Sequence, residues 1–440
     1  MEALKVAIAG LGVVGGGTAQ ALTRNADVIE RRAGRAIKLV KLADKNLDAA
    51  RAVCPAGCEV TDDALSIARD PGVDVVVELI GGTGFAKTLI MEAIANGKNV
   101  VTANKKLLAE NGNEIFAAAE AKGTQVRYEA AVAGSIPIIK ILRESATANR
   151  IDFVAGVING TSNYILTEMA REGKSFSEAL SDAQRLGYAE ADPTFDVEGV
   201  DAAHKLTIMA SLAFGMPLKF SKCHIEGVSG LDSKDVRYAN ELGYKVKLLG
   251  IARRDENGVQ LRVHPTLLPE NRLLASVDGV MNAVWTHGDL TGSSLLYGAG
   301  AGSLPTAGAV AADVIDLARA PQSCKNSLSA PPHLAFRPDA IEDLPIVPMS
   351  EVVCGYYIRI VADDQSGVLA KITEILAQQN ISIEALLQKS VLNSPLAEIV
   401  ILTHTTKERN AQAAIKAIEG LGRVRDKVHF IRTESFHFDN

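Results

Sequence analysis

A chain of 440 residues is longer than one ordinary hydrophobic core, so two to four domains are expected. Hydrophobic residues make up 47% of the chain and charged residues 22%, which is typical of a soluble globular protein. The net charge is −6 and no block of Lys and Arg is interleaved with aromatic residues, which argues against nucleic acid as a partner.

Membrane insertion and secretion are also disfavoured. No apolar run approaches the ~18 residues that a bilayer-spanning helix needs, and the N-terminus enters a strand pattern without a charged leader or a cleavage site. The five cysteines are odd in number and scattered, which suits free thiols in a reducing cytoplasm. Cys54 and Cys58 have no second Cys or His pair nearby, so a zinc site is not expected.

The N-terminal segment predicts a strand, a glycine-rich turn and a helix. LKVAIAG (residues 4–10) is an apolar run, GLGVVGGG follows at once, and GTAQALTRNA has the composition of a helix. A glycine triplet alone is weak evidence, but Gly10, Gly12 and Gly15 in the G-x-G-x-x-G register between a strand and a helix indicate dinucleotide binding. Gly10 allows the tight turn, Gly12 lets the backbone approach a pyrophosphate, and Gly15 lets the helix pack closely.

Further apolar runs predict a parallel sheet. Residues 37–43, 73–79 and 99–103 read as fully buried strands separated by helical runs. The second strand ends at Asp44 and Lys45, where such folds read the adenosine ribose. An acid there favours a free 2′-hydroxyl and a base favours a 2′-phosphate, so NAD and NADP both remain open.

Polar or glycine-rich loops follow the later strands, GGTG at 81–84 and Asn104-Lys105-Lys106. Ligands of such folds bind beyond the carboxyl ends of the strands. Lys105 could therefore reach the nicotinamide or the substrate, or it could be an exposed loop lysine; this pattern does not choose between them.

The next stretch contains a second candidate ligand-binding turn. Residues 125–142 predict a strand, a loop of small residues and a helix beginning near Pro137. DFVAGVI (152–158) predicts a strand that ends in NGTSNYIL. This polar turn could only cap the following helix, or it could present backbone N–H groups to an anionic ligand.

Residues 187–205 gather five carboxylates and close on a single lysine, Lys205. VDAAHKLTIMASLAF (200–214) predicts a helix, in which Asp201 and Lys205 stand four apart on one face. Such a pair is either a structural salt bridge or, on an otherwise apolar helix, a lysine facing a pocket whose ammonium could donate a proton. The carboxylates are those of Glu190, Asp192, Asp196, Glu198 and Asp201.

The rest of the chain predicts a sheet, a linker and a separate module. Short strands over 224–299 suggest an antiparallel or mixed sheet, followed by a glycine-rich loop at 298–303 and a helix over 306–319. Residues 321–348 hold six of the fifteen prolines and predict a linker. The tail then runs βαββαβ, the ferredoxin-like arrangement, with Asn380 as a plausible end of its first helix.

Six segments in this order resemble homoserine dehydrogenase: GLGVVGGG, VTANKKLLAE, YEAAVAGSIPII, INGTSNYIL, LGYAEADPTFDVEGVDAAHK and YGAGAG. The linker and tail resemble the ACT regulatory domain that many bacterial members carry. The resemblance covers essentially the whole chain, and residues 187–205 are its most specific part. It implies reversible reduction of L-aspartate 4-semialdehyde to L-homoserine with NADP or NAD, a step toward threonine, methionine and isoleucine.

The expected fold is therefore α/β with three domains and one linker. These are a Rossmann-type nucleotide-binding domain over 1–135 completed by 304–320, an α+β substrate and dimerisation domain over 136–303, a linker over 321–349, and an ACT domain over 350–440.

The resemblance also implies the site. Lys205 is the acid and base, Asp201 and Lys105 complete the catalytic group, and Lys105 lies between cofactor and substrate. This fits the chemistry, because hydride addition builds negative charge on oxygen that an ammonium can stabilise and protonate. The implied substrate contacts are Glu190, Asp196, Asp201, Gly160, Thr161 and Tyr188. The implied cofactor contacts are Gly10, Leu11, Gly12, Val13, Val14, Gly15, Asp44, Lys45, Gly82, Thr83, Thr102, Ala103, Lys105 and Gly302. A monovalent cation, Na⁺ or K⁺, is implied at the carboxylate of Glu129 and the main-chain oxygens of Val132, Gly134 and Ile136.

One departure and two alternatives stand beside this interpretation. Some relatives carry an arginine where Asp44 stands, which puts a strict NADP preference in doubt. A phosphorylating semialdehyde dehydrogenase would need a nucleophilic cysteine, and only Cys223 lies in the substrate domain. An amino-acid sensor with an inactive enzyme domain would have no reason to keep the acid cluster and Lys205. The expected partners are the substrate, threonine as effector at the ACT domain, and further copies in a homodimer or homotetramer.

Overall fold

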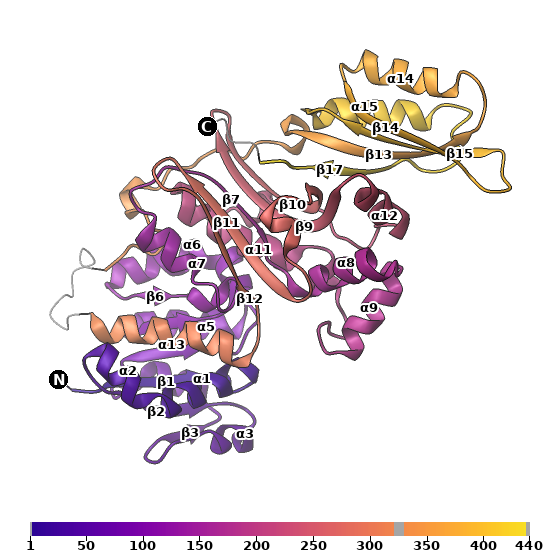
Figure 1. Ribbon diagram of the computed structural model, residues 1–440. Helices are drawn as coiled ribbons and strands as arrows, with labels where there is room; N and C mark the ends of the chain where they lie inside the picture. The colour runs from indigo at the N-terminus through magenta and orange to yellow at the C-terminus, as the bar shows by residue number, and fades with distance from the viewer. Residues whose placement is uncertain (1, 321–329, 437–440) are drawn as a thin grey trace. The chain divides into compact units, whose positions relative to one another are not determined.

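The computed structural model describes residues 2–320 and 330–436, which form two compact units (Figure 1). The first unit spans Met1–Ile158, Asp201–Cys223 and Met281–Leu344, and the second spans Asn159–Val200, His224–Val280 and Pro345–Asn440. The chain therefore passes between the units several times.

A six-stranded parallel sheet in the order β3-β2-β1-β4-β5-β6 forms the centre of the first unit. β1 pairs with both β2 and β4 in parallel, so the strand order reverses at β1. This is the order of the dinucleotide-binding fold, and the predicted Rossmann-type sheet is confirmed. Its strands are β1 (Leu4–Ala9), β2 (Ile37–Ala43), β3 (Glu59–Thr61), β4 (Val75–Glu78), β5 (Asn99–Thr102) and β6 (Val126–Arg127).

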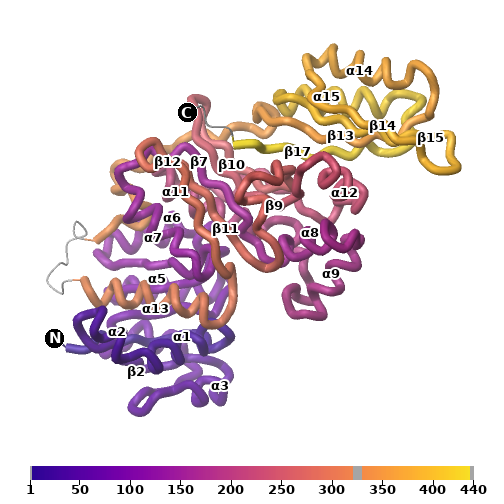
Figure 2. Tube along the Cα trace, in the orientation of Figure 1, coloured from indigo at the N-terminus to yellow at the C-terminus, as the bar shows by residue number. Residues whose placement is uncertain are grey.

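Helices cover both faces of this sheet, which explains why β1 and β4 consist mainly of buried apolar residues, with Lys5 in β1 and Glu78 at the end of β4 as the charged members (Figure 1). α1 and α13 lie side by side, although about 280 residues separate them (Figure 2). Ser303 Oγ donates to Val13 O at 2.8 Å, and a Cβ at Gly17 would lie 2.4 Å from Ser303 Oγ. The helices are α1 (Val13–Arg24), α2 (Ala26–Ala33), α3 (Leu47–Ala52), α4 (Ala64–Arg69), α5 (Phe85–Ala95), α6 (Lys105–Lys122) and α13 (Ser303–Arg319).

The first unit also contains nearly all of α11 (Val200–Phe214), whose residues are buried almost without exception. The helix expected near Pro137 begins at Ile138 but is short: α7 (Ile138–Lys140) passes into a π-helical turn, Ile141–Ser145. β11 pairs in antiparallel fashion with β7 on one side and β12 on the other. β12 extends to Ala299 and so includes the first two residues of the stretch expected as a loop. The strands of this group are β7 (Ile151–Val157), β11 (Met281–Gly288) and β12 (Gly292–Ala299).

The second unit combines the helices of the acid-rich segment with a long hairpin. β9 and β10 pair in antiparallel fashion over their whole length. The helices contact the hairpin and one another, α8 against α9, α12 and β9. The elements are α8 (Gly160–Glu172), α9 (Phe176–Arg185), α10 (Thr194–Val197), β8 (His224–Ile225), α12 (Ser233–Glu241), β9 (Tyr244–Asp255) and β10 (Gly258–Pro269).

The C-terminal module has the βαββαβ order, as predicted. α14 and α15 cover one face of its sheet, and Asn380 at the end of α14 has a left-handed φ of 56° (Figure 1). β17 lies between β13 and β10: it pairs antiparallel with β13 and parallel with β10. The elements are β13 (Val353–Asp363), α14 (Val368–Gln378), β14 (Ile383–Ser390), β15 (Leu396–Thr403), β16 (Thr406–Lys407), α15 (Glu408–Glu419) and β17 (His429–Thr433).

Among the residues that the structure describes, no helix is both long enough and apolar enough to cross a bilayer.

Candidate active site

The glycine loop has the backbone that a dinucleotide needs. Gly10 has a φ of 90°, which side-chain-bearing residues rarely adopt. A Cβ at Gly15 would lie 1.8 Å from Gly10 O, so α1 can start this close to β1 only with glycine there. A Cβ at Gly12 would meet nothing within 4 Å, so its outer side is open. These residues fit a pyrophosphate at the N-terminus of α1.

Asp44 is tied to the glycine loop by a hydrogen bond that the sequence did not reveal. Its Oδ2 accepts from Leu11 N at 2.5 Å and its Oδ1 accepts from Asn46 N at 2.7 Å. Lys45, the next residue, is exposed. The carboxylate is therefore fixed at the end of β2, beside the expected ribose position, whereas the side chain of Lys45 extends into solvent.

A buried carboxylate, Glu78, organises the loops after β4 and β5. It is 0% exposed, its Oε1 accepts from Ile80 N at 2.9 Å and Gly81 N at 3.0 Å, and its Oε2 accepts from Thr102 Oγ1 at 2.7 Å. Three hydrogen bonds compensate the burial of this anion. Sequence reasoning assigned Thr102 to the cofactor but missed Glu78, because a single acid at the end of an apolar run has no distinctive spacing.

Asn104 connects the same loops to the helix that carries Lys105. Its Oδ1 caps α6 by accepting from Leu107 N at 3.1 Å, and its Nδ2 donates to Gly82 O at 2.7 Å. Lys105 is the first residue of α6. The cap thus sets where Lys105 leaves the backbone relative to the glycine-rich loop at residues 81–84.

The first unit brings Lys105, Asp201 and Lys205 together. Asp201 Oδ2 lies 2.7 Å from Lys205 Nζ, and Asp201 Oδ1 lies 3.0 Å from Lys105 Nζ. Lys205 Nζ also donates to Ile158 O at 2.7 Å. The side chains of Asp201 and Lys205 are 4% and 9% exposed, whereas that of Lys105 is 34% exposed. One carboxylate therefore holds two ammonium groups beyond the carboxyl end of β5, where ligands of this fold bind.

His204, next to the catalytic candidate on α11, is not a competing proton donor. It is 1% exposed and its ring lies 4.2 Å from that of Phe220. Burial lowers the pKa of His204 to about 4, and Asp201 only partly opposes this shift. The imidazole is therefore neutral near pH 7, and Lys205 is the buried cation of this helix.

The second unit brings together the polar turn at the start of α8 and the acid-rich loop. Asn159 caps α8 by accepting from Ser162 N at 2.8 Å, and its Nδ2 donates to Asp196 Oδ1 at 2.8 Å. Thr161 Oγ1 lies 2.7 Å from Tyr188 O and 3.0 Å from Asp196 Oδ2, so its one hydrogen serves either acceptor. Asp196 therefore holds the start of α8 in place. Sequence reasoning assigned Asp196 to the substrate and did not foresee this bond to Asn159.

Three further predicted substrate residues line or flank the same turn. Gly160 is the first residue of α8, and a Cβ there would lie 2.9 Å from Val280 O. Tyr188 is 44% exposed with its ring 5.0 Å from that of Tyr164. Glu190 is exposed, and its main-chain oxygen accepts from Gln184 Nε2 at 3.2 Å.

The segment expected to hold a cation supplies hard oxygen donors. Glu129 is 2% exposed, and its carboxylate accepts two backbone N–H bonds from the start of α7, at 3.0 and 2.9 Å. Burial, and then the neighbouring Asp313, raises the pKa of Glu129 to about 8. Gly134 has a left-handed φ of 54°, a backbone conformation that glycine adopts readily. Ile136 O already accepts an N–H bond at 2.8 Å. Among the described residues no group of three or more His, Cys, Asp or Glu could hold a metal ion, so a cation here would depend on main-chain oxygens such as that of Val132.

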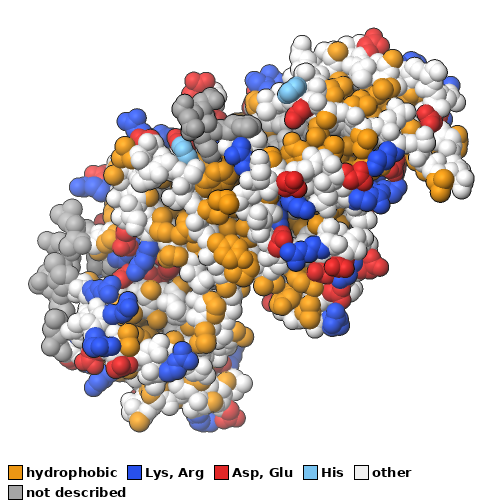
Figure 3. Space-filling model, in the orientation of Figure 1, with side chains coloured by type: hydrophobic (Ala, Val, Ile, Leu, Met, Phe, Trp, Pro, Cys, Tyr) orange, Lys and Arg blue, Asp and Glu red, His pale blue; other side chains and the backbone are white. Residues whose placement is uncertain are grey.

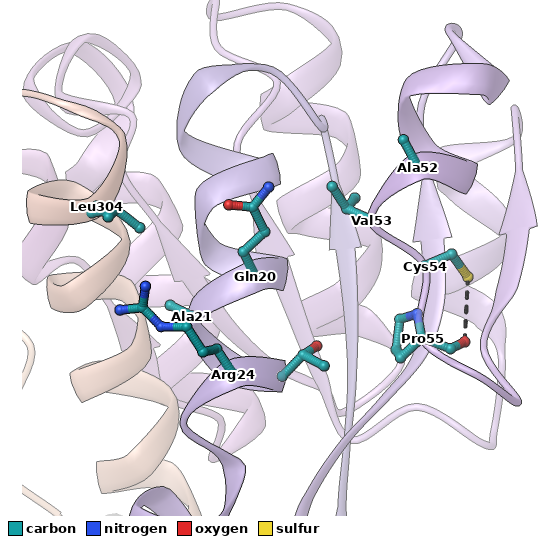
Figure 4. A pocket seen from close by; sticks show the side chains of 9 residues that line it. Gln20, Ala21, Arg24, Ala52, Val53, Cys54, Pro55 and Leu304 are labelled. Carbon is teal, nitrogen blue, oxygen red and sulfur yellow. Dashed lines mark hydrogen bonds between the residues drawn. The ribbon is translucent and has the colours of Figure 1, made fainter.

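A separate pocket of about 450 Å³ lies between α1, the segment after α3 and the start of α13 (Figure 4). Gln20, Arg24 and Leu304 line one side, and Cys54 and Pro55 the other. The thiol of Cys54 turns toward Pro55 O, 3.7 Å away. None of the predicted site residues lines this pocket, so it is not part of the candidate active site.

The surface has no dominant sign of charge on the face drawn in Figure 3. Lys and Arg side chains are interspersed with Asp and Glu side chains there. This mixture agrees with the small net charge of −6.

Comparisons with known proteins agree with the resemblance seen in the sequence. The family described as homoserine dehydrogenase matches residues 137–315, the homoserine dehydrogenase NAD-binding domain matches residues 10–129, and the ACT domain matches residues 356–423. A homoserine dehydrogenase of Neisseria gonorrhoeae is 55% identical over 99% of this chain and 100% of its own length. One of Pseudomonas aeruginosa is 52% identical over the same shares. The crystal structure of a homoserine dehydrogenase from Thiobacillus denitrificans superposes with a TM-score of 0.94 at 56% identity, covering 99% of each chain.

Proposed function

The chain belongs to the homoserine dehydrogenase family, an oxidoreductase family, and we propose that Lys205 is the proton donor that completes reduction of L-aspartate 4-semialdehyde to L-homoserine. The observation that carries this proposal is the buried Lys205 ammonium, 2.7 Å from both Asp201 Oδ2 and Ile158 O, with Lys105 on the other oxygen of Asp201. A salt bridge that served only to stabilise the surface would require neither a buried Lys205 nor Lys105 on the same carboxylate.

The bound nicotinamide supplies the hydride. As the hydride reaches the aldehyde carbon, negative charge develops on the carbonyl oxygen, and a nearby ammonium stabilises this charge. Lys205 Nζ then donates a proton to that oxygen, and in the reverse direction it takes the proton of the homoserine hydroxyl. Asp201 and Ile158 O fix the direction of the ammonium, which lowers the entropic cost of the transfer.

The substrate is a zwitterion, so its two charged groups need opposite partners. Its carboxylate fits the N–H groups of Gly160 and Thr161, the first two residues of α8, where the helix dipole favours an anion. Its α-ammonium fits carboxylates, and Glu190 and Asp201 take that role by family analogy. In this assignment Asp196 acts on the substrate indirectly, through its bonds to Asn159 and Thr161.

The cofactor is NAD or NADP, and we infer that NAD is preferred. The carboxylate of Asp44 is held by Leu11 N and Asn46 N, so it cannot swing away from a 2′-phosphate. Repulsion between a fixed carboxylate and a phosphate disfavours NADP, whereas a carboxylate accepts well from a 2′-hydroxyl. Lys45 is exposed and would have to reorder to compensate.

Regulation, the cation and assembly extend the proposal. The ACT module suits an amino-acid effector, and threonine, an end product of the pathway to threonine, methionine and isoleucine, is the effector we propose. A Na⁺ or K⁺ ion would be held by Glu129 and by the main-chain oxygens of Val132, Gly134 and Ile136, and its charge would oppose the burial that raises the pKa of Glu129. Assembly as a homodimer or homotetramer in the cytoplasm completes the proposal.

A thiol mechanism is not favoured. Burial raises the pKa of the Cys223 thiol to about 12, so almost no thiolate exists near pH 7. A phosphorylating semialdehyde dehydrogenase would need that thiolate as its nucleophile. The ordered Lys105, Asp201 and Lys205 group likewise gives no support to an inactive sensor.

The direct test is oxidation of L-homoserine by the purified chain with NAD⁺ and, separately, NADP⁺, each with and without threonine. Lys205→Met should lower kcat by about 10²- to 10⁴-fold, the usual scale for a general acid, in a chain that still folds but melts at a lower temperature because a buried ion pair is broken. Lys174→Met is the matched control, because Lys174 pairs with Glu168 and Asp182 on the surface of the second unit. Full turnover by Lys205→Met would remove this lysine from the mechanism.

A further inference from the structure

We propose that Lys247 on β9 is a positioning residue for the substrate carboxylate, acting through the loop at residues 277–280 on the first turn of α8. This inference rests on the proposed role of Gly160 and Thr161 as the carboxylate site. The Lys247 ammonium binds Val277 O, Asp278 Oδ1 and Asn163 Oδ1, and none of these residues belongs to the nucleotide loop or to the predicted substrate contacts.

Lys247 is a buried cation directed at one loop. It is 2% exposed, and its Nζ donates to Val277 O at 2.6 Å and to Asp278 Oδ1 at 2.9 Å. Asn163 Oδ1 lies 3.4 Å from the same nitrogen. Burying an ammonium is costly unless its hydrogen bonds are made, so these acceptors fix the loop and the lysine together.

The other side of the loop is held by α8. Asn163, one turn after the start of the helix, donates from Nδ2 to Val277 O at 3.0 Å and to Gly279 O at 2.9 Å. Gly279 N donates to Thr167 Oγ1 at 3.0 Å. Val277 O therefore accepts from the amide of Asn163 and from the ammonium of Lys247, so one carbonyl joins β9 to α8.

The loop ends against the residue that would bind the carboxylate. A Cβ atom at position 160 would lie only 2.9 Å from Val280 O, so any residue larger than glycine would collide with the loop. The backbone of Gly160 thus rests on Val280. A shift of the loop changes the position of the Gly160 and Thr161 N–H groups, and displacements of about 1 Å at a binding site can lower rates by about 10²-fold.

The competing interpretation is a purely structural ion pair between Lys247 and Asp278. Asp278 also binds Arg171 at 2.8 Å and its side chain is 38% exposed, so it keeps a partner and access to water when Lys247 is removed. Loss of Lys247 should therefore leave a folded chain. A structural role would reduce the melting temperature or the active fraction of enzyme but would not change the apparent affinity for one substrate.

The experiment compares Lys247→Met with Lys245→Met in the full-length chain. Lys245 lies two residues away on the same face of β9, and its Nζ donates to Asn240 Oδ1 at 3.1 Å. Lys247→Met should raise the KM for L-homoserine on the order of tenfold, leave the KM for the nicotinamide cofactor within about twofold, and leave kcat less affected than KM. Lys245→Met should match the wild type in all three.

Thr167→Val provides a second variant, because it removes the acceptor of Gly279 N at the far end of the loop, together with the bond that Thr167 Oγ1 donates to Asn163 O at 2.7 Å. It should raise the same KM by a smaller factor. Unchanged KM for homoserine in both variants, with only a lowered melting temperature, overturns the proposal. Thr161→Val distinguishes the carboxylate site from the positioning role of Lys247. If Thr161→Val raises the KM for homoserine while Lys247→Met does not, the carboxylate site is supported and the positioning role is refuted. If the wild-type chain does not oxidise homoserine, both the proposed function and the positioning role are refuted.

Discussion

Replacing Asp201 with asparagine tests the central geometry, because one carboxylate holds two ammonium groups. The substitution keeps the shape of the side chain but leaves one oxygen for two donors at 2.7 and 3.0 Å, and turns an NH₂ group toward the other lysine. A hydrogen bond to a charged group contributes about 1.5–3 kcal/mol. The Lys205 bond is buried and takes the upper end of this range, whereas Lys105 is 34% exposed and its bond is discounted for solvent screening.

A loss of about 3 kcal/mol corresponds to a fall of about 10²-fold in kcat/KM for homoserine oxidation. The assay is steady-state oxidation at a temperature below the melting temperatures of both proteins. Asp182→Asn is the control, because Asp182 also lies between two cations, Lys174 at 3.0 Å and Arg185 at 2.7 Å, but on the surface helix α9. If Asp201→Asn kept kcat/KM within about threefold of the wild type, Asp201 would not orient Lys205 and the mechanism would need another source of order.

The remaining predictions concern specificity, the thiol, pH and the tail. Asp44→Ser should shift the ratio of kcat/KM with NAD⁺ to that with NADP⁺ about tenfold toward NADP⁺, and an unchanged ratio would show that Asp44 does not read the ribose. Cys223→Ser should keep kcat within about twofold, since burial raises the pKa of that thiol to about 12; abolished turnover would contradict this. Burial alone would raise the pKa of Glu226, but hydrogen bonds from His224 and Arg432 lower it well below its usual range. A carboxyl group with a lowered folded pKa stabilises the fold above its unfolded pKa of about 4.3, so the melting temperature of the wild type should fall more steeply below that pH than that of Glu226→Gln. Removing residues 350–440 should lower the melting temperature, because buried charged side chains in the rest of the second unit would lose the oppositely charged partners that the tail supplies. A truncated chain that is as stable as the wild type and still active would refute this.

Much of the fold follows from the sequence because the relevant signals are local. Most strands of the parallel sheet are rich in apolar residues, and the glycine spacing between β1 and α1 reflects a backbone that only glycine allows. Asp201 and Lys205 lie one helical turn apart, so their contact at 2.7 Å was implied by their spacing. In the βαββαβ tail, the hydrophobic period likewise changes between that of a strand and that of a helix from one element to the next.

The rest of the site depends on contacts that no spacing encodes. Lys105 and Asp201 are 96 positions apart, and their meeting depends on how α6 and α11 pack. Ile158 contributes its main-chain oxygen, which every residue possesses, so its role could not be read from its identity. Glu78 and Asn104 do the reverse, because their side chains bind the backbone of loops, and their spacing in the sequence does not reveal this. The prediction therefore found side chains with unusual charge and missed those that hold backbone in place.

The parallel pairing of β17 with β10 affects how the tail can be exchanged between relatives. Thr266 and Leu267 of β10 face Arg432 and Thr433 of β17, and Arg432 binds Glu226 and Glu408 at once. A chimaera joined near residue 350 would place a foreign final strand against β10 and would remove Arg432, so Glu226 would lose the bonds that it accepts from this arginine. An exchange of the tail that keeps these contacts would therefore carry β8, β9 and β10 with it, so that the recombination boundary falls before residue 224.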